Sequence, residues 1–116
     1  MKQVNKRYLS LRESWEKLDL FNQMGNIGSE VGRMYNAMRT NMDDRKQGAI
    51  NQGLELFDLT EEIWIERGWT ARVKELKAAR NEFVISVESD HPDDSLERYF
   101  NQFAYAARNR RERQIT

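Results

Sequence analysis

Acidic side chains recur in the middle of the chain at a spacing that could carry metal chemistry. Glu55 and Asp58 are three residues apart, and a helix places residues with that spacing on one face. Together with Glu30 from an earlier segment, they could hold a magnesium ion and hydrolyse a nucleotide. All-helical nucleotide pyrophosphohydrolases pair an E-x-x-E helix with an E-x-x-D helix. ELFD at Glu55–Asp58 matches the second half, but Glu30 lacks a carboxylate partner at three or four residues. The sequence therefore favours a solvated helix face.

Other catalytic arrangements are incomplete. The chain has one histidine and no cysteine, so neither a Glu-x-x-His di-iron site nor a thiolate nucleophile can be built. That histidine, His91, falls in an expected loop. No serine lies in a nucleophile-elbow motif, and GNIGSEVG does not follow the phosphate-loop pattern. We therefore assign no catalytic residue and expect no cofactor.

Arg80 stands where the helical spacing of its apolar neighbours requires another apolar residue. An arginine at such a position must extend outward to water or pair with a carboxylate. Its candidate partners are Glu30, Asp58 and Glu75. An ion pair at the edge of the core, drawn from Glu30, Asp58 and Arg80, is a simpler explanation than a pocket for an anionic ligand.

The C-terminal end is basic. Arg108, Arg110, Arg111 and Arg113 could contact phosphates of RNA or DNA. The whole chain, however, has 19 basic and 19 acidic residues, whereas domains that hold duplex nucleic acid are usually clearly basic. Cations at a helix C-terminus also suit the helix dipole. We therefore favour a helix C-terminus with a solvated basic tail, and nucleic acid stays an alternative partner.

Small residues accompany the most regular apolar stripe. The segment Leu20–Arg39 has apolar residues spaced four and three apart, as one side of a helix requires. Beside this stripe lie Gly25, Gly28, Ser29 and Gly32, which are poor helix formers. We expect them to let another helix of the same chain come close, with a self-complementary dimer face as the alternative.

Apolar periodicity and capping residues define the remaining elements. A capping box at Ser10–Glu13 predicts a short first helix, Asp19 can cap the second, and Asp43 or Asp44 the third. Gly68 marks the end of the third helix, and Thr70 can cap the fourth. The expected helices are Leu11–Lys17, Leu20–Arg39, Arg45–Glu66, Ala71–Val87 and Ser95–Arg110. Whether the first is separate from the second stays open.

These elements predict an all-α fold, an antiparallel up-and-down four-helix bundle with a short extra N-terminal helix as an option. The 116 residues suit a single domain, with loose ends at residues 1–9 and 111–116. With 39% hydrophobic and 33% charged residues, no run approaches the roughly 20 apolar residues of a membrane span. The N-terminus lacks the apolar region of a secretory signal. We expect a cytoplasmic protein without a membrane partner.

Three segments, Met24–Arg33, Leu54–Thr60 and Tyr99–Arg108, read MGNIGSEVGR, LELFDLT and YFNQFAYAAR. Together they resemble a family of small, uncharacterised, all-helical bacterial proteins, and the resemblance extends from Trp15 to Arg108. It implies no activity and no catalytic residue. The polar positions inside its recurrent segments are Asn26, Glu30, Arg33, Glu55, Asp58, Arg80 and Arg108.

The residues together favour a non-catalytic interaction protein that forms a homo-oligomer or serves as an accessory subunit. The first alternative is an accessory protein that binds RNA or DNA through its Arg-rich end. The second is a magnesium-dependent nucleotide pyrophosphohydrolase that uses Glu30, Glu55 and Asp58.

Overall fold

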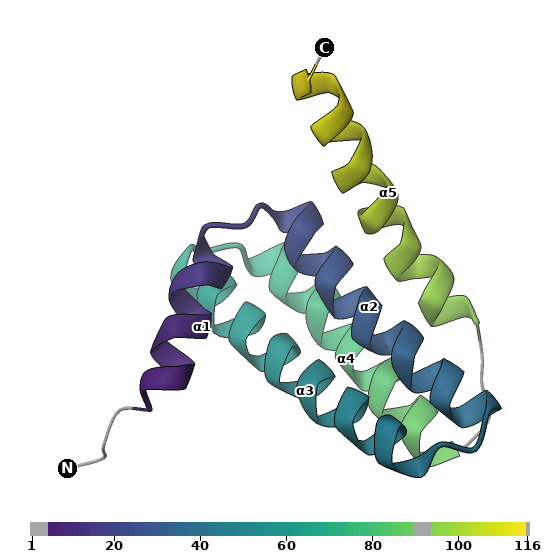
Figure 1. Ribbon diagram of the computed structural model, residues 1–116. Helices are drawn as coiled ribbons and strands as arrows, with labels where there is room; N and C mark the ends of the chain where they lie inside the picture. Colours follow the sequence, from purple (N-terminus) through teal and green to yellow (C-terminus); the bar gives the residue numbers. More distant parts are fainter. Residues whose placement is uncertain (1–4, 90–93, 116) are drawn as a thin grey trace.

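A computed structural model describes residues 5–89 and 94–115 of the chain, with side chains as far as residue 110. Every secondary-structure element in the described part is a helix, which confirms the all-α prediction (Figure 1). The five helices are α1 (Lys6–Glu16), α2 (Leu20–Arg39), α3 (Asp43–Glu66), α4 (Thr70–Ser89) and α5 (Ser95–Ile115).

The first helix starts earlier than its sequence signals indicated. Asn5 caps α1, because its side chain accepts a hydrogen bond from the backbone N–H of Arg7. Ser10 therefore lies inside the helix instead of at its start, and residues 6–9 belong to α1 instead of to a loose arm. A short break then separates α1 from α2. Asp19 caps α2 as expected by accepting from the backbone N–H of Asn22 at 2.8 Å.

The ends of α2 and α3 are set by backbone conformation. Asn41 has a φ of 56° in the turn between these helices. Asp43 and Asp44 lie in the first turn of α3, so neither is its N-cap. Their negative charge still favours that helix end. Gly68, with a φ of +75°, follows the end of α3 and adopts the left-handed conformation that a helix stop requires.

The last two helices are longer than expected. α4 runs from Thr70 to Ser89, and α5 continues to Ile115, so residues 111–115 are helical. His91 lies outside the described residues. None of the helices in the described part of the chain combines the length and the apolar character needed to cross a bilayer.

Helix α2 is the central element. It packs mainly against α3 on one side and α5 on the other, while α4 packs on α3 and barely contacts α5. α1 lies against one end of α3. Figure 1 shows α2, α3 and α4 side by side and α5 inclined to them, with its C-terminal turns standing clear of the other helices. The radius of gyration, 15.0 Å, exceeds the roughly 13.4 Å expected for a compact domain of this length.

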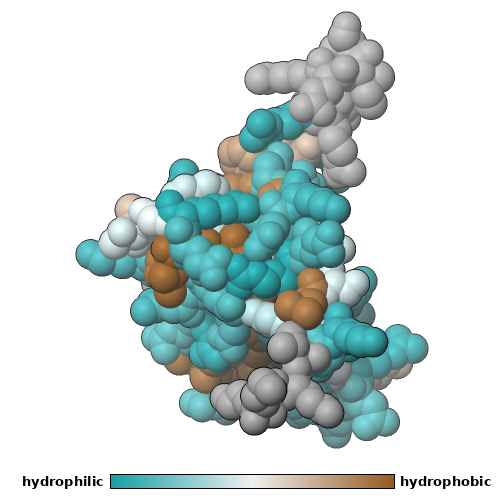
Figure 2. Space-filling model, turned by 90° about the vertical axis from the view of Figure 1, so that its left-hand side faces the viewer, coloured by the Kyte–Doolittle hydropathy of each residue, from teal (hydrophilic) through white to brown (hydrophobic). Residues whose placement is uncertain are grey.

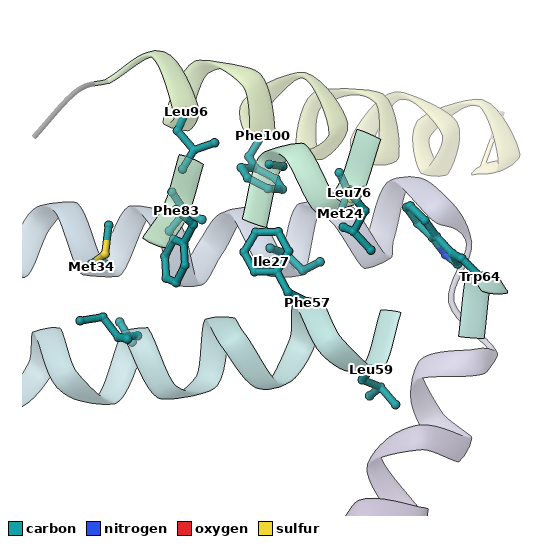
Figure 3. Packing of buried hydrophobic residues seen from close by; sticks show 14 of the residues in the cluster. Met24, Ile27, Met34, Phe57, Leu59, Trp64, Leu76, Phe83, Leu96 and Phe100 are labelled. Carbon is teal, nitrogen blue, oxygen red and sulfur yellow. The ribbon is translucent and has the colours of Figure 1, made fainter. Parts of the chain in front are cut away.

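The core gathers around three phenylalanine rings. Phe57 of α3 lies 5.5 Å from Phe83 of α4 and 5.9 Å from Phe100 of α5, measured between ring centroids. Ile27 of α2 lies among them, and Trp64 closes the end of the core near α1 (Figure 3). All five helices thus contribute to one continuous apolar interior, α1 through Trp15.

Candidate binding surfaces

The structure does not bring the three candidate metal ligands together. Glu55 pairs with Arg7 at 3.1 Å, and Asp58 pairs with Arg80 at 2.9 Å. Glu30 pairs instead with Arg33. The three arginines belong to α1, α4 and α2, so each carboxylate is held in a different contact. No group of three or more histidine, cysteine or acidic residues in the described part of the chain could hold a metal. The magnesium arrangement suggested by the spacing on α3 is therefore absent from these residues.

Arg80 makes its ion pair at the outer edge between α3 and α4. Its Nε donates to Oδ1 of Asp58 at 2.9 Å, and the two side chains are 36% and 59% exposed. Glu30 has a different partner and does not reach Arg80. The pair therefore lies at the solvent-exposed edge of the core.

A surface network that sequence reasoning missed joins α1 to α3. Arg12 donates to Glu16 of its own helix and to Glu62 and Glu66 of α3. Tyr8 donates to Glu62, and this hydrogen bond is the main reason that the pKa of Tyr8 is raised. Hydrogen bonding, first to Tyr8 and then to Glu66, raises the pKa of Arg12, although desolvation opposes the rise. In the sequence, this network is indicated only by the four-residue spacing of Tyr8, Arg12 and Glu16, which places them on one helix face.

Beneath this surface network, a series of buried hydrogen bonds also joins α1 to α2 and α3. Gln23 of α2 is fully buried, donates to the carbonyl of Trp15 at 3.0 Å, and accepts from Nε1 of Trp64 at 2.9 Å. Nε1 of Trp15 donates to Thr60, whose hydroxyl donates to the carbonyl of Leu56. Every buried polar side-chain atom in the described part of the chain has a partner. These buried hydrogen bonds are therefore structural, and they fix α1 against α2 and α3.

The small residues of α2 face two environments. A Cβ atom added to Gly28 would lie 2.7 Å from Cβ of Phe100, and one added to Gly25 would lie 3.5 Å from Cα of Ala104. These two glycines therefore allow α5 to cross α2 closely. Ser29 is exposed and donates to the carbonyl of Gly25, while a Cβ at Gly32 would meet nothing within 4 Å.

The basic residues of α5 are used differently. Arg110 lies 3.7 Å from Asp19 and its guanidinium stacks 5.2 Å from the ring centroid of Phe21. Arg108 is exposed, makes no ion pair with the described residues, and lines a small polar groove with Asn22 and Asn26. Arg111 and Arg113 lie in the last turns of α5, and their side chains are outside the described part.

The largely unpacked seam between α4 and α5 forms one of several surface hollows. This α4–α5 groove has a volume of about 380 Å³ and is lined by Glu75, Ala78, Ala79, Asn81, Glu82, Ser95, Leu96 and Tyr99. Tyr99 donates to Glu75 at 2.6 Å across it. Burial, and then this hydrogen bond, raise the pKa of Tyr99. Glu82 makes no ion pair within the described residues.

The second hollow, the α2–α3 cleft, has a volume of about 400 Å³. Its lining residues are Glu30, Arg33, Asn36, Ala37, Met42, Arg45, Gly48, Ala49 and Gln52. The cleft is polar, in contrast to the apolar floor of the α4–α5 groove. A third hollow, with a volume of about 500 Å³, is lined by Leu20 and by residues 68–72. The face in Figure 2 is mostly hydrophilic, with separate apolar patches.

Comparisons of the chain with protein-family models, with curated proteins and with solved structures found no match.

Proposed function

We propose that this chain is a non-catalytic helical interaction protein that self-associates, with the end of α5 from one copy seated in the α4–α5 groove of the next. The observation that carries this proposal is the open α4–α5 groove itself. α4 and α5 make few contacts with each other, although each packs well on its other neighbour. We further propose that α2–α5 form an antiparallel four-helix bundle that is open along this seam. We also propose, from the three segments at Met24–Arg33, Leu54–Thr60 and Tyr99–Arg108, that the chain is related to small helical bacterial proteins.

The groove has the properties of a helix-binding surface. Its apolar lining residues are Ala78, Ala79 and Leu96, of which the last two are buried. Its carboxylates are those of Glu75, which is paired with Arg72 at 3.4 Å, and of Glu82. Small apolar residues allow a partner side chain to lie deep between two helices, as in helix-in-groove recognition. An acidic rim favours a partner helix that carries basic residues.

The end of α5 offers the complementary surface. Tyr105 is 65% exposed, the largest exposed fraction among the large hydrophobic residues described. Arg108 follows three residues later, so both side chains lie on one helix face. Tyrosine and arginine are enriched among residues that dominate binding energy. The C-terminal turns of α5 also stand clear of the other helices, where a second copy can reach them (Figure 1).

An interface between two different surfaces has consequences for the assembly. The groove and the α5 end lie on separate parts of each copy, so the contact is head-to-tail instead of two-fold symmetric. Such contacts build rings when the rotation closes and filaments when it does not. The proposal therefore requires each copy to make two contacts, one through each surface.

Light scattering on the eluted peak of a gel-filtration column tests this proposal. Tyr105→Ala removes the aromatic anchor, and Glu82→Arg places a positive charge opposite Arg108. We expect each to convert the wild-type oligomer into a monomer. Ile65→Ala is the matched control, because Ile65 is 57% exposed on α3 and lies outside both surfaces. A monomeric wild type at high concentration would overturn the proposal, as would an oligomer that neither substitution affects.

One observation favours a second candidate, an accessory protein that binds nucleic acid. Arg108 is exposed beside the amides of Asn22 and Asn26 and has no ion-pair partner in the described part. Arginine and amide side chains both contact phosphate and sugar groups. This function predicts binding of single-stranded RNA that weakens with salt and with Arg108→Gln. Absence of binding at low salt would exclude it.

A further inference from the structure

The α2–α3 cleft is lined by a buried carboxylate. Glu30 is only 7% exposed, and it is the one acidic residue among the buried residues of the described part. Its single ion pair there is to Nη1 of Arg33 at 2.6 Å, and the Arg33 side chain is itself 67% exposed. A buried charge normally requires paired and buried partners, because removing it from water is costly. Because Glu30 lines the cleft and its one ion-pair partner in the described part is exposed, a ligand in the cleft can compete for its carboxylate.

Glycines of α3 lie opposite Glu30. A Cβ added to Gly53 would make an ordinary contact with Cβ of Glu30 at 3.7 Å, and its close contact, at 3.0 Å, would be with Cζ of Phe83. Across the cleft, a Cβ at Gly48 would meet nothing within 4 Å. The cleft volume of about 400 Å³ lies within the roughly 300–1,000 Å³ of small-molecule sites, so it suits a nucleotide better than a single ion.

The charges of the cleft restrict the ligand. Its charged lining residues are Glu30, Arg33 and Arg45, and Arg45 makes no ion pair within the described part of the chain. Two guanidinium groups and one carboxylate give a net positive cleft, which disfavours a purely cationic ligand. Arginine binds phosphate oxygens with two parallel N–H groups. The ligand therefore combines an anionic group with N–H donors for the carboxylate.

We infer that the α2–α3 cleft binds a guanine base with an adjacent phosphate, through Glu30 for the base and Arg33 and Arg45 for the phosphate. An ionised carboxylate only accepts hydrogen bonds, and its two oxygens match two neighbouring donors. Guanine presents such a pair, the ring N–H and the exocyclic amino group. Adenine and cytosine place an acceptor next to their amino group, so one carboxylate oxygen would face a lone pair.

The same chemistry can come from a free nucleotide or from a guanine in a single strand. The remaining lining residues suit either source, since Asn36 and Gln52 carry amides for the base carbonyl or the ribose. This inference is independent of self-association, because it uses neither the α4–α5 groove nor the exposed end of α5.

Titration calorimetry on the full chain with guanosine, inosine and adenosine monophosphates tests the inference. Inosine monophosphate differs from the guanosine compound only by lacking the exocyclic amino group. We expect it to bind about tenfold more weakly, because one of the two hydrogen bonds to the carboxylate is lost, and adenosine monophosphate to bind more weakly still. Glu30→Gln should abolish the preference for guanine, whereas Glu55→Gln, the matched change at a carboxylate that faces α1, should leave it unchanged.

The structural consequence of each variant is checked by its thermal melt. If Glu30→Gln does not fold, Arg45→Gln tests the cleft instead, because it should weaken binding of the monophosphate while leaving that of guanosine unchanged. A hexanucleotide with one guanine, compared with the same strand carrying adenine, separates the two sources. Tighter binding of the strand assigns the site to nucleic acid, and tighter binding of the monophosphate assigns it to a nucleotide. Equal affinity for all three monophosphates, or no binding at millimolar concentration, would overturn the inference.

Discussion

The close crossing of α2 and α5 predicts opposite effects for two similar substitutions. A methyl group at Gly28 would lie 2.7 Å from Cβ of Phe100, an atom tied closely to the α5 backbone. The two helices must therefore move apart, and overpacking of this kind destabilises by about 1–3 kcal/mol. At Gly32 the same methyl group meets nothing within 4 Å. There only the helix propensity changes, which stabilises by about 0.8–1 kcal/mol.

The difference between the two variants isolates the steric effect. Gly28→Ala gains the same propensity and loses the packing, so its stability should fall by about 0–2 kcal/mol below wild type. Gly32→Ala should exceed wild type, and the two variants should differ by about 1–3 kcal/mol. Urea unfolding followed by circular dichroism measures both free energies. If Gly28→Ala is as stable as Gly32→Ala, α5 does not cross α2 as closely as described.

Three further predictions concern polar groups. Gln23→Met keeps the buried volume but leaves the indole N–H of Trp64 without a partner, while the carbonyl of Trp15 still accepts from the backbone N–H of Leu18; it should therefore lower the free energy of unfolding by about 1–3 kcal/mol in urea titrations. Arg80→Leu should change it by less than about 1 kcal/mol, because the Arg80–Asp58 pair is largely exposed; a loss of several kcal/mol would show that the pair does determine how α3 meets α4. The folded-state pKa of Tyr99 is raised above its usual 10.0, so the unfolded chain loses that proton first and this contribution to stability declines as the pH rises above about 10. Tyr99→Phe should therefore flatten the fall in unfolding free energy between pH 9 and pH 11, and an unchanged slope would contradict the assignment.

The elements that follow apolar periodicity were predictable, and those that depend on single polar contacts were not. α2 has the expected bounds because its stripe and the Asp19 cap act within one segment. The start of α1 at Lys6 depends on Asn5 and on contacts of Tyr8 and Arg12 with α3, about 50 residues away in sequence. Gln23 lies three residues after Leu20 and four before Ile27, so helical spacing places it on the apolar side of α2. Only the arrangement of Trp15 and Trp64 shows which groups its amide bonds.

In the candidate sites, too, spacing within one helix was predictable and contacts between helices were not. Spacing on α3 correctly places Glu55 and Asp58 one helical turn apart, but it does not indicate which neighbouring helix supplies each arginine. Asp58 was a named partner for Arg80, whereas the pairing of Glu30 with Arg33 is local to α2. Neither the α2–α3 cleft nor the α4–α5 groove has a sequence signature, because each forms only when two helices pack.

A mixing experiment tests the proposed head-to-tail assembly most directly. The Tyr105→Ala chain keeps an intact groove, and the Glu82→Arg chain keeps an intact α5 end. Each should be monomeric alone in light scattering, and an equimolar mixture should form a dimer with one copy of each and nothing larger. A mixture that stays monomeric, while wild type forms oligomers under the same conditions, would contradict the pairing of the α5 end with the α4–α5 groove.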